Sequence, residues 1–156
     1  YVLTAGHQKL LQQHNRREIR IYPDGNCLFS SLITQGVFKE PPSSTPKVRE
    51  FRNHLSTLLH QGKLKIDDLS PTDSVETIAR EIAVSGHYTG DAGELAPELI
   101  SRALGIKLLI YNADGSTTPV GPEEQNWPIY HLIRFTTCIQ RGQIEKKLHY
   151  HAAVPQ

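Results

Sequence analysis

The spacing of apolar residues is helical in the first two thirds of the chain and strand-like in the last third. Val48, Phe51, Leu55 and Leu59 recur every three or four residues, which predicts an amphipathic helix that ends near Gly62. The remaining helical segments are expected from Cys27 onward, after Pro71, over residues 93–104 and, as a polar helix or arm, over residues 1–20. A proline-rich break over residues 39–46 predicts a loop before the amphipathic helix.

Strands are expected after Gly105. Residues 106–111 form a continuous apolar run of strand length, which predicts a buried strand in the middle of a sheet. Shorter segments with strand-like composition follow at residues 117–120, 129–135 and 148–154. Helices followed by strands, rather than a regular alternation of the two, favour an α+β fold.

Composition fits a single domain over residues 1–156. A chain of 156 residues with 38% hydrophobic content can bury one core. The net charge is +1 with acidic and basic residues well mixed, so we expect no nucleic-acid partner. No apolar run reaches the length of about 18 residues that a membrane span needs, and no secretory leader is visible, so we expect no membrane partner.

The chain has two cysteines, Cys27 and Cys138. Neither belongs to a CxxC pair or to a spacing typical of a zinc site, so no metal is expected. A disulfide between them is the alternative, but it would need an oxidising compartment. We therefore expect free thiols in the cytoplasm. Methionine is absent even from position 1, which suggests an excised domain. If that domain came from a viral or bacterial effector, the compartment would be the host cytoplasm.

Cys27 is the strongest candidate for a nucleophile. It follows the polar turn Asp24-Gly25-Asn26 and begins the apolar helical segment that continues through Leu28. The unpaired N–H groups and positive dipole end of a helix N-terminus stabilise a thiolate and can bind an oxyanion. Cys138 lies in a threonine-rich extended segment and is expected to be structural. This context predicts a cysteine hydrolase.

A thiolate of this kind needs a base, and the last predicted strand offers His149 and His151. Residues two apart on a strand point to the same face, so either imidazole could face Cys27. The other histidines are scattered along the chain, and a solvated or hydrogen-bonded role is the default for them.

The segment from Tyr22 to Phe29, together with His149-Tyr150 near the C-terminus, resembles the ovarian tumour (OTU) family of cysteine proteases. The segment from Gly93-Glu94-Leu95 to residue 111 is similar to the acidic-Leu helix and following strand of that family. The resemblance spans residues 20 to 154. It implies a papain-like OTU fold, with a central, mainly antiparallel sheet between helices, and the activity of a deubiquitinase.

The resemblance also implies roles for individual residues. The base is followed by an aromatic residue in the family, which favours His149 over His151. Many relatives carry Asn or Asp two positions after the base, where this chain has His151, so the third member of the triad is open. Asp24 is assigned to loop support and oxyanion stabilisation, and is the nearest carboxylate in the motif. Gly25 and Asn26 are assigned to the same loop, with the N–H groups near Gly25 and Cys27 as oxyanion donors.

Three further residues are candidates for contact with substrate: His87 and Tyr88 in a glycine-rich loop, and Glu94. The resulting interpretation is a monomeric thiol isopeptidase that needs no cofactor and acts on ubiquitin or polyubiquitin chains, with ubiquitin-like modifiers as additional substrates. Two alternatives stay open. One is a catalytically weak OTU-like module that binds ubiquitin, and the other is a cysteine protease that processes its own polyprotein.

Overall fold

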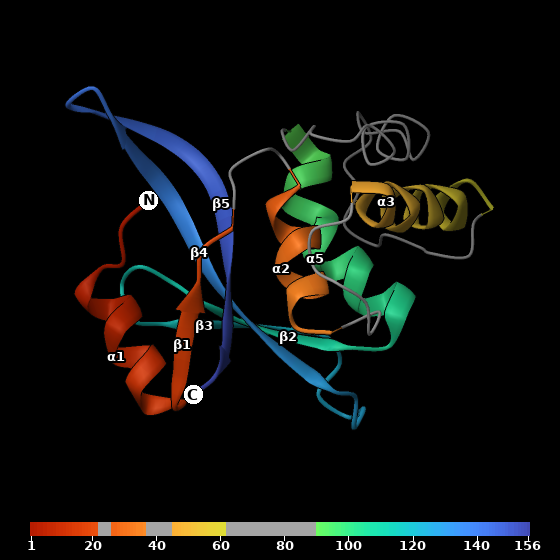
Figure 1. Cartoon of the computed structure of the whole chain (residues 1–156). Helices are drawn as coiled ribbons and strands as arrows, with labels where there is room; N and C mark the ends of the chain where they lie inside the picture. Colours follow the sequence, from red (N-terminus) through yellow and green to blue (C-terminus); the bar gives the residue numbers. More distant parts are fainter. Residues whose placement is uncertain (22–25, 37–44, 62–89) are drawn as a thin grey trace.

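The computed structural model describes residues 1–21, 26–36, 45–61 and 90–156, which form helices around a five-stranded sheet (Figure 1). The described helices are α1 (Ala5–Gln13), α2 (Cys27–Thr34), α3 (Thr45–His60) and α5 (Gly90–Leu104). The strands are β1 (Arg16–Ile19), β2 (Lys107–Tyr111), β3 (Thr117–Val120), β4 (Ile129–Gln140) and β5 (Gln143–Pro155). None of the described helices is long and apolar enough to cross a membrane.

The strands lie in the order β1-β5-β4-β2-β3. Three of the four pairings are antiparallel, and only β2 and β4 run parallel. This confirms the expected α+β class and the mainly antiparallel sheet. The long β4–β5 hairpin projects beyond the rest of the sheet in Figure 1. The expected strands at residues 129–135 and 148–154 are therefore the paired ends of longer strands that meet at this hairpin.

Helices cover both faces of the sheet (Figure 1). On one face, buried side chains of α2, α3 and α5 pack against Leu108, Leu132 and Tyr150 of the sheet. On the other face, Leu10 and Leu11 of α1 pack with alternate sheet positions such as Ile133. Because successive strand residues point to opposite faces, one strand contributes to both cores.

The N-terminal segment differs from its prediction. Residues 1–20 were expected to be an arm or a helix, and they form α1 and then the edge strand β1, whose residues Arg16–Ile19 pair with residues 152–155 of β5. Thr4 caps the start of helix α1, because its hydroxyl accepts a hydrogen bond from the His7 backbone N–H. The buried His7 ring then joins this helix to the sheet, because its Nε2 lies 2.9 Å from the Arg134 carbonyl oxygen.

Three predicted elements lie wholly or partly outside the described residues. The helix after Pro71 and the part of the glycine-rich loop that holds His87 and Tyr88 fall within residues 62–89, and most of the proline-rich loop falls within residues 37–44. The end of the glycine-rich loop, residues 90–93, is instead the first turn of α5. The other predicted helices and strands are present, with ends that differ by a few residues.

Candidate active site

Cys27 is the first residue of α2, as the sequence predicted. Its N–H is one of the first four of the helix, which have no partner within the helix, and it lies at the positive end of the helix dipole. The residue is buried, with 2% of its surface exposed, and its sulfur is not part of a disulfide. Cys138 is also a free thiol, buried on β4.

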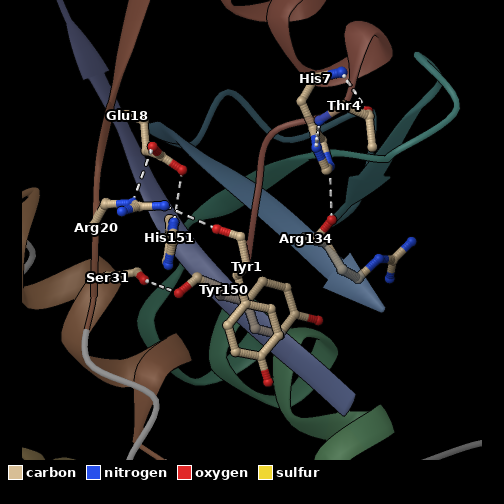
Figure 2. Close-up of polar contacts among 9 residues, drawn as sticks. All are labelled: Tyr1, Thr4, His7, Glu18, Arg20, Ser31, Arg134, Tyr150 and His151. Carbon is tan, nitrogen blue, oxygen red and sulfur yellow. Dashed lines mark hydrogen bonds and ion pairs between the residues drawn. The ribbon is translucent and has the colours of Figure 1, made fainter. Parts of the chain in front are cut away.

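Helix α2 packs against β5 next to the two histidines. The Ser31 hydroxyl lies 2.6 Å from the Cys27 carbonyl oxygen. It also lies 3.3 Å from the Tyr150 carbonyl oxygen (Figure 2). One hydroxyl therefore joins the backbone of Cys27 to the backbone of the residue between His149 and His151. Ser31 was not singled out from the sequence, because a serine one turn into a helix carries no signal of its own.

His149 and His151 lie on the same face of β5, as the alternation predicted, and both are buried. Their rings meet edge to face, with centroids 4.6 Å apart and planes at 88°. The ring of Phe135, on β4, lies beside both. Tyr150 between them points to the opposite face and joins the core beneath α2.

The His149 ring is oriented by its neighbours. It makes a hydrogen bond with the backbone of Ile21, on the segment that leads toward Cys27, and this bond raises its pKa. The Tyr1 ring stacks on it at 4.2 Å between centroids. Its Nε2 has no hydrogen-bond partner among the described residues. Burial, followed by the nearby His151, lowers the pKa of His149 to about 4, so near pH 7 this nitrogen is an unprotonated base.

His151 has different partners. Its Nδ1 lies 2.8 Å from Glu18 Oε2, on β1 (Figure 2). Burial lowers the pKa of His151, and the bond to Glu18 opposes that effect. The two rings therefore differ in their described partners: His149 bonds to the Ile21 backbone, and His151 bonds through Nδ1 to Glu18. The assignment of His149 as the base, and its pairing with the Cys27 thiol, stay predictions.

Asn26 occupies the cap position before α2, where its side chain makes no capping bond to the helix. Its Oδ1 instead accepts a hydrogen bond of 3.1 Å from Nη1 of Arg52 on α3. Arg52 is itself buried, and its guanidinium lies 4.7 Å from the centre of the Phe29 ring. Arg52 thus ties the residue before Cys27 to a neighbouring helix. The role of Asn26 in supporting the oxyanion loop stays a prediction.

Sequence reasoning missed Arg52, although a signal was present. It lies among the apolar positions Phe51 and Leu55, where an arginine breaks the hydrophobic stripe of the helix. A charged residue on such a face must be paired when buried. Glu18 was also missed, because nothing in its local sequence distinguishes it from the charged residues around it.

The other predicted site residues are not placed. Asp24 and Gly25, and likewise His87 and Tyr88, lie outside the described residues, and Glu94 lies on α5 where only the backbone is described. Within the described part of the chain, no three His, Cys, Asp or Glu side chains are grouped so that they could hold a metal ion.

Comparison with solved structures identifies the fold. The chain is similar to the OTU domain of OTUD1, with a TM-score of 0.65 and 20% identity over 95% of this chain and 91% of that one. It is also similar to an OTU domain in complex with ubiquitin (TM-score 0.61, 19% identity, 88% of this chain and 69% of that one). A third similar structure is the Hazara virus OTU bound to ubiquitin (TM-score 0.61, 17% identity, 90% of this chain and 82% of that one).

No family model matches the sequence, and no curated protein matches it. The structural similarity nevertheless spans nearly the whole chain. The protein therefore has the OTU fold, as its resemblance to that family implied.

Proposed function

We propose that this protein is a cysteine-type deubiquitinase that hydrolyses the bond between the ubiquitin C-terminus and a lysine amine. The observation that carries the proposal is the meeting of α2 and β5. There the helix that begins at Cys27 is joined through Ser31 to the strand that presents His149, whose Nε2 has no hydrogen-bond partner among the described residues. The OTU fold and the ubiquitin complexes of two similar structures support ubiquitin as the substrate.

In the proposed reaction, His149 Nε2 accepts the thiol proton as Cys27 Sγ attacks the terminal carbonyl carbon of ubiquitin. The C–N bond then breaks, and the same proton passes to the departing lysine amine. Water attacks the thioester, gives a proton back through His149 to the thiol, and releases the ubiquitin carboxyl group. The backbone N–H groups near Gly25 and Cys27 are the proposed donors to the oxyanion.

The test is reaction with ubiquitin that carries an electrophile at its C-terminus. At neutral pH we expect one adduct, on Cys27, with Cys138 unlabelled, as read by mass spectrometry of the digested product. Cys27→Ala is expected to abolish labelling, and Cys138→Ala is the matched control that retains it. A folded protein that binds ubiquitin without forming the adduct would instead be a ubiquitin-binding module, and labelling of Cys138 would contradict the proposal.

A further inference from the structure

A carboxylate outside the predicted catalytic motifs lies against the candidate site. Glu18 is on β1, and 15% of its side chain is exposed. Its Oε2 is 2.8 Å from Nδ1 of His151, whose side chain is 4% exposed (Figure 2). An ionised carboxylate can only accept hydrogen bonds, so Nδ1 of His151 must carry the proton of this contact. Glu18 therefore fixes both the tautomer and the orientation of the His151 ring.

The Glu18 carboxylate is also connected, through Arg20, to Tyr1, whose ring stacks on His149. Nε of Arg20 lies 3.7 Å from Glu18 Oε1, and Nη2 of Arg20 donates a hydrogen bond of 3.0 Å to the Tyr1 carbonyl oxygen (Figure 2). The Tyr1 ring stacks on the His149 ring, and the His151 ring meets the His149 ring edge to face. Because the Arg20 side chain is 70% exposed, its ion pair is weak, and the buried bond to His151 is the stronger connection.

Burial favours a neutral His151 ring, although charged groups lie around it. Three charged or titratable side chains face it: Glu18 on β1, Arg20 just after that strand, and His149 on its own strand. Burial is the largest effect and lowers the pKa of His151, Glu18 raises it, and Arg20 lowers it. A neutral His151 avoids a second positive charge beside His149 when that ring accepts a proton.

We propose that Glu18 is a positioning residue that acts through His151, holding that ring against His149 so that the His149 imidazole keeps the orientation that the proposed reaction needs. The inference rests on the proposed function. The proposal gives His151 a role at the position where the family resemblance implies Asn or Asp. It also assigns the acidic group of the site to Glu18 on β1, which lies 133 positions before His151 in the sequence.

A double-mutant cycle tests the proposal. Glu18→Gln keeps the size of the side chain, but an amide can donate as well as accept, so Nδ1 of His151 no longer has to carry the proton. We expect the rate of ubiquitin-chain cleavage to fall on the order of tenfold, as for other residues that orient a functional imidazole. In the His151→Asn background the same substitution should have little effect, because the ring through which Glu18 acts is gone. Equal losses in both backgrounds, or no loss in either, would overturn the proposal.

The matched control is Glu98→Gln, which breaks the exposed ion pair between Glu98 and Arg102 on α5, where the two side chains are 45% and 38% exposed. It should leave cleavage unchanged. Circular dichroism of each variant separates a change in folding from a change in rate.

A second measurement does not need activity. In ¹⁵N spectra of the imidazole nitrogens, His151 of the unmodified protein should be the Nδ1–H tautomer, and Glu18→Gln should introduce the Nε2–H form and lower the pKa of His151. An Nε2–H ring in the unmodified protein would contradict the inference. If the ubiquitin electrophile fails to label Cys27 while the tautomer is as expected, the proposed function fails and the placement of Glu18 stands.

Discussion

At the residue scale, the two histidines of β5 are distinguished by their hydrogen bonds rather than by their burial. Within the part of the chain that the structure describes, Nε2 of His149 has no hydrogen-bond partner, whereas Nδ1 of His151 bonds to Glu18. We expect His149→Ala to reduce the rate of ubiquitin-chain cleavage by several orders of magnitude, because removing one member of a catalytic unit costs nearly as much rate as removing all of its members. His151→Ala should cost about tenfold to a hundredfold, in line with the loss of an orienting group. Rates on diubiquitin measure both.

His151→Asn, which restores the residue type that the family resemblance implies, should retain or raise the activity. The converse pattern, with His149→Ala nearly fully active and His151→Ala inactive, would identify His151 as the base.

Tyr1 contributes to the site by excluding water from His149. Its ring stacks on that imidazole, and burial is the largest cause of the lowered pKa of His149. In Tyr1→Ala the ring of His149 should become hydrated, so its pKa should rise from about 4 toward the ordinary value of 6.5. An NMR titration of the imidazole resonances measures the shift. Val2→Ala is the matched control, because Val2 is 70% exposed, and an unchanged pKa in Tyr1→Ala would contradict this explanation.

At the scale of elements, α3 holds the start of α2 in place through a buried cation. Arg52→Met should leave the Asn26 oxygen without its charged donor, which we expect to lower the free energy of unfolding by about 1–3 kcal/mol. Alkylation of Cys27 by iodoacetamide should also slow, because a buried positive charge near a helix start favours the thiolate. Denaturant unfolding and alkylation rates test the two effects.

Arg49→Met provides the control for this prediction, because Arg49 is exposed on the same helix. Unfolding and alkylation should both match the unmodified protein. A loss of stability as large as that of Arg52→Met would show that any charge removed from α3 has the same effect.

At the scale of the whole molecule, several buried or half-buried histidines make stability depend on pH. Burial lowers the pKa of His149 and of His131 to about 4, and it also lowers the pKa of His7. Between about pH 4 and pH 6.5 the unfolded chain binds more protons than the folded one. The contribution of these histidines to the free energy of unfolding is therefore complete above pH 6.5 and is lost as the pH falls toward 4.

Urea unfolding at pH 7.5 and at pH 5 tests this expectation, and the effect of His149 alone should be on the order of 2 kcal/mol. His131→Gln should reduce the difference between the two pH values, whereas His54→Gln, on the exposed side of α3, should leave it unchanged. Equal stability at both pH values would contradict the lowered pKa values.

The sequence by itself determined those features that depend on neighbouring residues. Its periodicity predicted α3, α5 and the strands β2 to β5, and the polar turn before an apolar helix placed Cys27 at the N-terminus of α2. The alternation of β5 also placed His149 and His151 on one face. These patterns are local, because the direction of the side chains repeats at a fixed spacing along a helix or a strand.

Only the tertiary structure decided which distant residues surround the candidate site. Strand β1 is short and charged, and it is a strand because residues 16–19 pair with residues 152–155 at the edge of the sheet. That pairing brings Glu18 to His151, while the packing of α3 on α2 brings Arg52 to Asn26. Such contacts follow from sheet order and helix packing across the whole chain, and no local pattern of residues encodes them.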